Sequence, residues 1–226
     1  MNTQHKQRDS HRIFRLFLGL FVYAVGIVLT VHADIGLSPW DVLHQGLSKQ
    51  LGITFGATSI LVSAVIVLCV AICKEHVGIG TLFNMVFIGL FIDILMLGEF
   101  IPVAASPVTG VLMMVAGLFT IAVASVLYIG AGYGAGPRDS LMVVFSKRTG
   151  KPAGLCRSCV ELVVLIAGWF LGGKAGIGTL ISALGIGVAV QIVFSALHFN
   201  VSLIRQESFI ETFRRIQFFF SARKQH

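Results

Sequence analysis

The sequence has 226 residues, of which 56% are hydrophobic and only 12% are charged, and its mean hydropathy is +0.89. A soluble domain keeps about a quarter of its residues charged, so this composition excludes a soluble globule and indicates an integral membrane protein. The net charge of +7 does not indicate nucleic-acid binding, because the basic residues flank apolar runs and form no patch interleaved with aromatic residues on a soluble domain.

Six apolar stretches are long enough to cross a hydrocarbon core about 30 Å thick. In chain order they are residues 14–33, 55–73, 78–98, 110–130, 155–172 and 177–198. The first stretch follows a basic segment and ends in TVHAD, which is also the pattern of a cleavable signal peptide. We expect a retained helix there, because a similar stretch recurs at 115–131, deep inside the chain.

The segment after the first stretch predicts a short helix. Ser38 suits the N-cap, Pro39 the first helical turn, Asp41 the third position of a capping box, and Gly52 the left-handed stop. A helix of about 12 residues is about 18 Å long at 1.5 Å per residue, so it cannot span the bilayer.

Two placements of this short helix remain open. One is a helix that lies flat at the membrane interface, because an apolar stripe at helical spacing stands opposite a polar one. The apolar stripe is Trp40, Leu43, Leu47 and Leu51, and the polar one is Asp41, His44, Gln45 and Ser48. The other is a re-entrant half-helix whose N-terminus points into a cavity at membrane depth.

The sequence repeats itself at a spacing of 98 positions. Residues 17–96 align without a gap on 115–194, and VGIGTLFNMVFIGLFIDI lies over AGIGTLISALGIGVAVQI. Gly136, Pro137, Asp139 and Gly150 accordingly mark a second short helix. The GIGT motifs that open the third and sixth spans allow close helix packing; their glycines are Gly78, Gly80, Gly176 and Gly178.

The predicted fold is an all-α polytopic membrane protein with six spans, arranged as two inverted three-helix repeats that each carry a short non-spanning helix. The predicted divisions are a basic cytoplasmic segment 1–13, repeats at 14–98 and 99–198, and a basic amphipathic cytoplasmic tail 199–226. The distribution of Lys and Arg agrees with this topology, since only Lys49 and Lys174 fall in outside segments. Both termini are therefore expected in the cytoplasm.

Asp41 and Asp139 are the equivalent acidic residues of the two short helices. Each could cap a helix start or bind a cation or proton. Arg138 could form an anion site at a helix N-terminus, or serve as a cytoplasmic topology charge. Trp40 and His44 are further candidates for solute or ion binding on the first short helix.

Ionisable residues inside spans are costly and face a partner or a water-filled cavity. Glu161 in the fifth span is the first candidate for proton coupling, with Arg157 four residues earlier as an alternative salt-bridge partner. Asp93 in the third span is the second candidate, and Gln191 occupies the equivalent position of the other repeat.

No metal or cofactor is predicted. The glycines between Gly130 and Gly136 follow no strand and therefore form no dinucleotide loop. The four cysteines do not match across the repeat and behave as apolar residues of helices. No catalytic signature stands at credible spacing, so we expect no enzyme.

The stretches GLSPWDVLHQGLS, GIGTLFN, GPRDSLM and ELVVLIAGWFLGGKAGIGTL resemble the YczE-like branch of the YczE/YyaS/YitT bacterial membrane proteins. The resemblance covers nearly all of residues 12–198 and implies a bacterial inner-membrane protein of about six helices. Proteins of this family are usually described as transporters, with no established substrate.

Two functions are open at this point. The first is a secondary transporter or permease for a small polar solute, coupled to protons or to no ion, since the sequence has no ATP-binding motif. The second is a non-transporting accessory protein that stabilises a membrane enzyme complex. The partners we expect are the lipid bilayer, the solute and a second copy of the chain.

Overall fold

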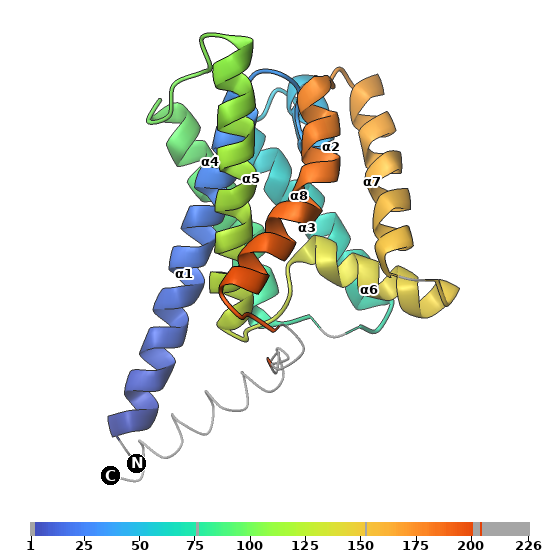
Figure 1. Cartoon of the computed structure of the whole chain (residues 1–226). Helices are drawn as coiled ribbons and strands as arrows, with labels where there is room; N and C mark the ends of the chain where they lie inside the picture. The colour runs from blue at the N-terminus through green and yellow to red at the C-terminus, as the bar shows by residue number, and fades with distance from the viewer. Residues whose placement is uncertain (1–2, 76, 152, 201–203, 205–226) are drawn as a thin grey trace.

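The computed structural model describes residues 3–75, 77–151, 153–200 and 204, and it is helical throughout with no strand in those ranges (Figure 1). The helices are α1 Thr3–His32, α2 Pro39–Leu51, α3 Phe55–Ile72, α4 Ile79–Leu97, α5 Pro107–Gly130, α6 Pro137–Thr149, α7 Ala153–Phe170 and α8 Ile177–Ala196. Most of the predicted amphipathic tail lies outside the described residues. The start of α1 and the end of α8 lie at the same end of the bundle (Figure 1).

Among the described residues, five helices are long and apolar enough to cross a membrane. They are Ser10–His32 of α1, together with α3, α4, α5 and α8. Their outward faces carry large apolar side chains such as Leu68, Leu112 and Leu184, each more than 60% exposed. The protein is therefore a membrane protein whose helices contact lipid. The fifth predicted span, 155–172, corresponds to α7, which is not among these five.

The basic N-terminal segment is not separate from the first span, because α1 is continuous from Thr3. Two arginines of α1 donate hydrogen bonds to backbone carbonyl groups at the C-terminal end of α5. The Arg12 Nε donates to the carbonyl oxygen of Ala131 at 2.9 Å, and the Arg15 Nη2 donates to that of Val126 at 2.9 Å.

The predicted boundaries of the two short helices are confirmed. Pro39 and Pro137 open α2 and α6. Gly52 and Gly150 end them in the left-handed conformation, with φ of 66° and 67°. Ser38 is the N-cap of α2 as predicted, since its hydroxyl accepts the Asp41 N–H at 3.4 Å. The Asp41 carboxylate accepts the same Ser38 hydroxyl at 2.5 Å. Gly136 caps α6 without a side chain.

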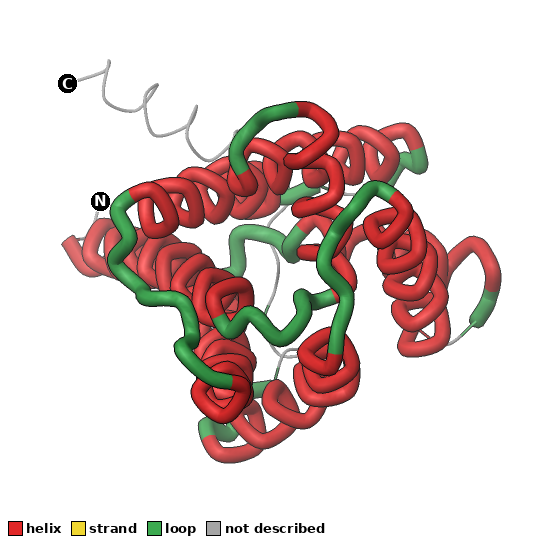
Figure 2. Tube along the Cα trace, turned by 90° about the horizontal axis from the view of Figure 1, so that it is seen from above, coloured by secondary structure: helices red, strands yellow, loops and turns green. Residues whose placement is uncertain are grey.

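Backbone hydrogen bonds cross between the two halves at positions that differ by 98. The Gly178 N–H donates to the Ile35 carbonyl oxygen at 2.8 Å, and the Gly80 N–H donates to that of Tyr133 at 2.7 Å. Thus the loop before each short helix pairs with the GIGT motif of the other half. Seen from above, loop segments lie within the outline formed by the helices (Figure 2).

These crossings leave no room for a side chain. Gly36, at φ 117°, would place a Cβ 2.6 Å from the Gly176 nitrogen. Gly134, at φ 123°, would place one 2.8 Å from the Gly78 Cα. Glycine is therefore required at both loops for its backbone conformation and for the close approach.

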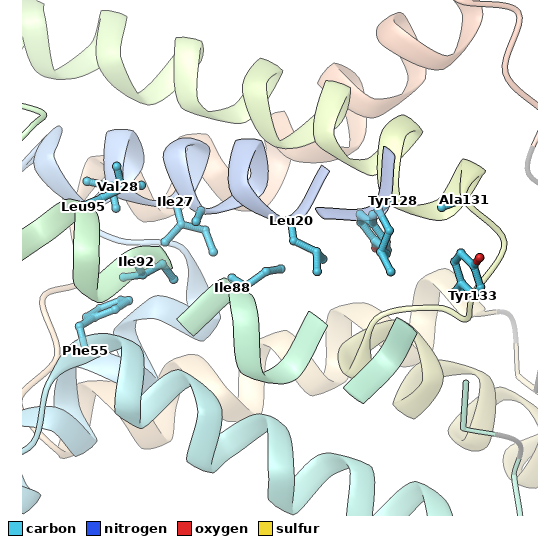
Figure 3. Packing of buried hydrophobic residues seen from close by; sticks show 12 residues of the cluster. Leu20, Ile27, Val28, Phe55, Ile88, Ile92, Leu95, Tyr128, Ala131 and Tyr133 are labelled. Atoms are coloured by element: carbon cyan, nitrogen blue, oxygen red, sulfur yellow. The ribbon is translucent and has the colours of Figure 1, made fainter. Parts of the chain in front are cut away.

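One buried apolar cluster joins α1, α4 and the end of α5 (Figure 3). Leu20 and Ile92 are fully buried within it. In the same region α1 crosses α5 closely, because a Cβ on Gly26 would meet the Gly117 carbonyl oxygen at 3.0 Å. This close contact fixes the central pair of helices, and α4 and α8 pack on its two sides.

The two halves differ where α3 meets α4. A Cβ on Gly89 would lie 2.6 Å from the Gly56 carbonyl oxygen, so α3 and α4 are in close contact. Gly187, the residue 98 positions after Gly89, has nothing within 4 Å of such a Cβ. Accordingly α7 packs against α2 and α6 rather than along α8, and it stands apart from α8 in Figure 1.

A second difference is the filling of the outer groove. Phenylalanines of α1 and α4 stack against one another in edge or tilted contacts; they are Phe17, Phe21, Phe83, Phe87 and Phe91. At the equivalent positions α8 carries the smaller residues Ile181, Gly185 and Ala189, and α5 carries Val115 beside the retained Phe119. These residues line an apolar groove of about 350 Å³.

Candidate functional site

The N-termini of α2 and α6 meet inside the bundle. The Arg138 guanidinium lies 5.0 Å from the centre of the Trp40 ring, and its Nη2 lies 4.0 Å from the Asp41 Oδ1. Trp40 and Arg138 occupy equivalent positions of the repeat. The starts of the two short helices are therefore held together by a cation–π contact and an attraction between opposite charges.

The burial of α2 does not follow the stripes expected of a helix that lies flat at the membrane interface. Asp41 and His44, on the expected polar stripe, are only 2% and 1% exposed, whereas Leu51 of the expected apolar stripe is 51% exposed. Trp40 is also buried. Both faces of the first turns are covered by protein, which agrees with the re-entrant alternative.

A polar cavity of about 80 Å³ lies beside these helix starts. Its wall is drawn from every helix except α8. Hydroxyl and amide groups come from Tyr23, Ser59, Ser63, Asn84 and Tyr128, and charged groups come from Arg138, Asp139, Arg157 and Glu161. A cavity needs about 10–15 Å³ to hold one water, so this cavity has room for several water-sized groups.

Asp139 lines the cavity, unlike its counterpart Asp41. Its Oδ2 accepts a hydrogen bond from the Tyr128 hydroxyl at 3.2 Å. The Tyr128 ring packs edge-on against that of Tyr23, with centroids 5.9 Å apart. Because the two aspartates have such different surroundings, they cannot perform the same role.

Glu161 and Arg157 form the predicted salt bridge. The Arg157 Nε donates to the Glu161 Oε1 at 2.8 Å, with side-chain exposures of 46% and 17%. Both residues line the cavity, and so does Ser63, the repeat partner of Glu161. Glu161 is therefore a paired charge at the cavity wall.

Asp41 and His44 form a buried pair one turn apart on α2. The Asp41 Oδ1 lies 3.4 Å from the His44 Nδ1, but this Oδ1 and both ring nitrogens make no hydrogen bond with the described residues. The His44 ring packs edge-on against Phe55, with centroids 5.8 Å apart. Buried polar atoms without partners are unusual and costly, about 1–3 kcal/mol each.

Burial has opposite effects on these two groups. It lowers the pKa of His44 below its ordinary value of 6.5; the Arg138 charge acts in the same direction, and Asp41 opposes both. Burial alone would raise the pKa of Asp41, but His44, Arg138 and Ser38 outweigh it and hold the pKa of this carboxyl below its ordinary value. The pair is therefore a carboxylate beside a neutral imidazole near pH 7.

Asp93 lies outside the cavity. Its Oδ1 accepts the backbone N–H of Gly56 at 2.8 Å, and its Oδ2 accepts the Thr54 hydroxyl at 2.5 Å. It thus holds the start of α3 against α4. Gln191, its repeat counterpart on α8, is exposed and lies outside the cavity wall.

The GIGT glycines lie at the crossed loops and not at the cavity wall. The four cysteines are free thiols. In the part of the chain that the structure describes, no three His, Cys, Asp or Glu side chains are grouped so that they could hold a metal ion.

The sequence interpretation missed several cavity residues, of which the tyrosines are the most informative. The chain has only three tyrosines, and two of them, Tyr23 and Tyr128, line the cavity. A rare hydroxyl-bearing ring in the middle of a predicted span is the signal that could have identified them.

The family model described as a family of unknown function (DUF6198) matches residues 10–195. The chain is 38% identical over 178 residues to the uncharacterized membrane protein YczE of Bacillus subtilis, covering 77% of this chain and 81% of that protein. It is 32% identical over 185 residues to an uncharacterized protein of Haemophilus influenzae, covering 80% and 83%. It is 27% identical over 168 residues to the uncharacterized protein YyaS of Bacillus subtilis, covering 73% and 83%.

No solved structure matches the chain. The family match spans the helices α1 to α8 that build the crossed loops and the cavity. The chain belongs to the DUF6198 family and is a YczE-like membrane protein.

Proposed function

We propose that the protein is a secondary transporter or permease for a small polar solute, with no catalytic step. The observation that carries the proposal is the cavity at the meeting point of the α2 and α6 N-termini, lined by polar side chains of both halves. Paired short helices whose N-termini face each other are a recurrent way of building a solute site at the membrane midplane.

The proposed architecture is six spans in two inverted three-helix repeats, in which α7 is a span in addition to the five helices named above. The crossed hydrogen bonds at equivalent positions support the duplication. The common location of the α1 start and the α8 end supports termini on one face of the membrane. The excess of Lys and Arg in these segments favours the cytoplasmic face of a bacterial inner membrane.

Single-cysteine accessibility tests this proposal. The natural Cys69, Cys73, Cys156 and Cys159 are first replaced by serine, and single cysteines are placed along 34–45 and 132–143. The reagent is a small charged thiol reagent, added to intact cells and to inverted membrane vesicles. We expect it to modify positions in both segments, because water must reach a solute path. A cysteine at Leu112, which is exposed on the outside of α5, serves as the lipid-facing control.

Protection of both segments from either face would overturn the transporter proposal and favour the accessory function. Tags fused to the first and last residues test the topology independently. Tags found on opposite faces would overturn the inverted repeat.

A further inference from the structure

The Arg138 side chain has hydrogen-bonding capacity that the protein does not use. A guanidinium carries five N–H donors in a rigid planar fork. Arg138 stacks on Trp40 and lies 4.0 Å from Asp41, yet it makes no hydrogen bond to any described residue. Its side chain is 27% exposed and lines the cavity.

The surroundings of this fork favour an anion. The first turn of α6 has no side-chain cap at Gly136, so the positive end of its dipole faces the same region. The Asp139 carboxylate of that turn also lines the cavity and accepts the Tyr128 hydroxyl at 3.2 Å. The second guanidinium of the wall, Arg157, is already paired with Glu161 at 2.8 Å. A planar oxyanion such as a carboxylate is the group that matches a free guanidinium fork.

Binding such an anion would change the charge balance at Asp41. The only cation near its buried carboxylate is Arg138, among the residues that the structure describes. If Arg138 turns to an anion, the carboxylate loses its counter-charge in a buried site, where an unpaired charge is costly. The adjacent His44 can restore the balance by taking up a proton, because its Nδ1 lies 3.4 Å from the Asp41 Oδ1 and its Nε2 makes no hydrogen bond with the described residues.

We propose that a small planar oxyanion binds Arg138 in the cavity and that the buried Asp41–His44 pair takes up one proton with it. The neutral imidazole gains the proton and becomes an imidazolium that faces the Asp41 carboxylate. The pair changes from a net charge of −1 to 0, and the anion brings −1. The loaded protein therefore has the same total charge as the empty one. This inference rests on the proposed transport function.

The groups that act on His44 are few. Asp41 lies on its own helix, Arg138 reaches it from α6, and the Phe55 ring of α3 covers it. Asp93 of α4 is held at the start of α3 by Thr54 and Gly56. The repeat counterpart of His44 is Met142, which cannot take up a proton. One proton per anion is therefore expected.

Linkage makes the two events favour each other. The Arg138 charge disfavours the protonated forms of both Asp41 and His44, so engaging that charge elsewhere raises their proton affinity. By reciprocity, proton uptake must strengthen anion binding by the same factor. For one proton, this strengthening is at most about tenfold per pH unit.

Trp40 supplies the optical probe, because Arg138 stacks on its ring. The chain has two tryptophans, so a Trp169→Phe background leaves Trp40 alone. The purified full-length protein is titrated with formate and with nitrate, two small planar oxyanions, between pH 6 and pH 8. Chloride at equal ionic strength is the control, since a spherical anion lacks the planar oxygens that match the guanidinium fork.

We expect formate or nitrate to change the Trp40 fluorescence, with an apparent Kd that tightens severalfold per unit as the pH falls. His44→Met, which copies residue 142 of the other repeat, should bind the anion with a Kd that is constant within about twofold over this range. Arg138→Lys, which keeps the charge but loses the fork, should weaken binding about tenfold or more. His44→Gln replaces His44→Met if the latter does not fold.

Absence of a response to both anions would overturn the anion site. An undiminished pH dependence in a folded His44 variant would overturn the proton site. Either result, combined with water access in the cysteine experiment, would remove this inference and leave the transport proposal intact. Protection of both segments would instead remove the transport proposal itself.

Discussion

The carboxylate of Asp93 accepts the backbone N–H of Gly56 at 2.8 Å and so fastens the start of α3 to α4. The same carboxylate accepts the Thr54 hydroxyl. A charged acceptor that satisfies free donors at a helix start stabilises the folded protein, and its loss leaves those donors unpaired.

Replacement of Asp93 by alanine should therefore lower the free energy of unfolding by about 1–3 kcal/mol. Thermal unfolding in detergent measures the effect. Gln191→Ala, at the equivalent exposed position on α8, is the matched control and should change the melting temperature little. Equal losses in both variants would contradict the role assigned to Asp93.

The Gly89 and Gly187 pair provides a second matched comparison. Gly89→Ala should destabilise the protein, because the added methyl would stand 2.6 Å from the Gly56 carbonyl oxygen. Gly187→Ala should be neutral or stabilising by up to about 1 kcal/mol, because the site is open and alanine favours the helix. The melting temperatures of the two variants test this comparison. A similar drop in both would contradict it, because it would mean that Gly187 of α8 is packed as closely as Gly89 of α4.

The buried imidazole predicts loss of stability in acid. The pKa of His44 in the folded protein is below 6.5, so the unfolded chain binds this proton more readily than the folded protein does. The contribution of His44 is fully present above about pH 6.5 and is lost as the pH falls below it, by at most about 1.4 kcal/mol per unit.

Thermal unfolding at intervals between pH 8 and pH 5 measures this effect. The His44→Met variant should show a flatter dependence over the same range, with formate and nitrate absent. A profile that the substitution leaves unchanged would show that other groups control acid stability.

The Arg157–Glu161 pair should contribute little to stability, because the arginine side chain is 46% exposed. Glu161→Gln should cost less than about 1 kcal/mol of unfolding free energy. It should also keep the pH dependence of formate binding, since the proton is assigned to Asp41 and His44. A pH-independent Kd in Glu161→Gln would return the proton to Glu161, the first candidate from the sequence.

The local features of the fold could be predicted from the sequence because neighbouring residues determine them. Pro39 and Gly52 mark the ends of α2 through their own backbone preferences, and Pro137 and Gly150 do so for α6. The Arg157–Glu161 contact was equally accessible, since residues four apart on a helix are neighbours.

Long-range partners could not be predicted in the same way. The stripe of α2 favoured no single placement, because periodicity does not reveal that the other half covers Asp41 and His44. Asp93 was a candidate for proton coupling, but one of its partners is the backbone N–H of Gly56. Such a backbone contact cannot be inferred from the identity of the residues. The contact of Tyr128 with Asp139 also depends on the fold of the loop between them.

The crossed loops have a consequence for the ancestry of the molecule. In each half, one loop carbonyl group accepts its hydrogen bond from the other half: Ile35 accepts from Gly178, and Tyr133 accepts from Gly80. Under the proposed duplication, the single-unit ancestor would have had to pair with a second unit of opposite orientation, in a two-fold symmetric contact, before either was complete. Fusion into one chain then made this contact between two separate units permanent. The glycines at the crossed loops are the positions of that contact that tolerate substitution least.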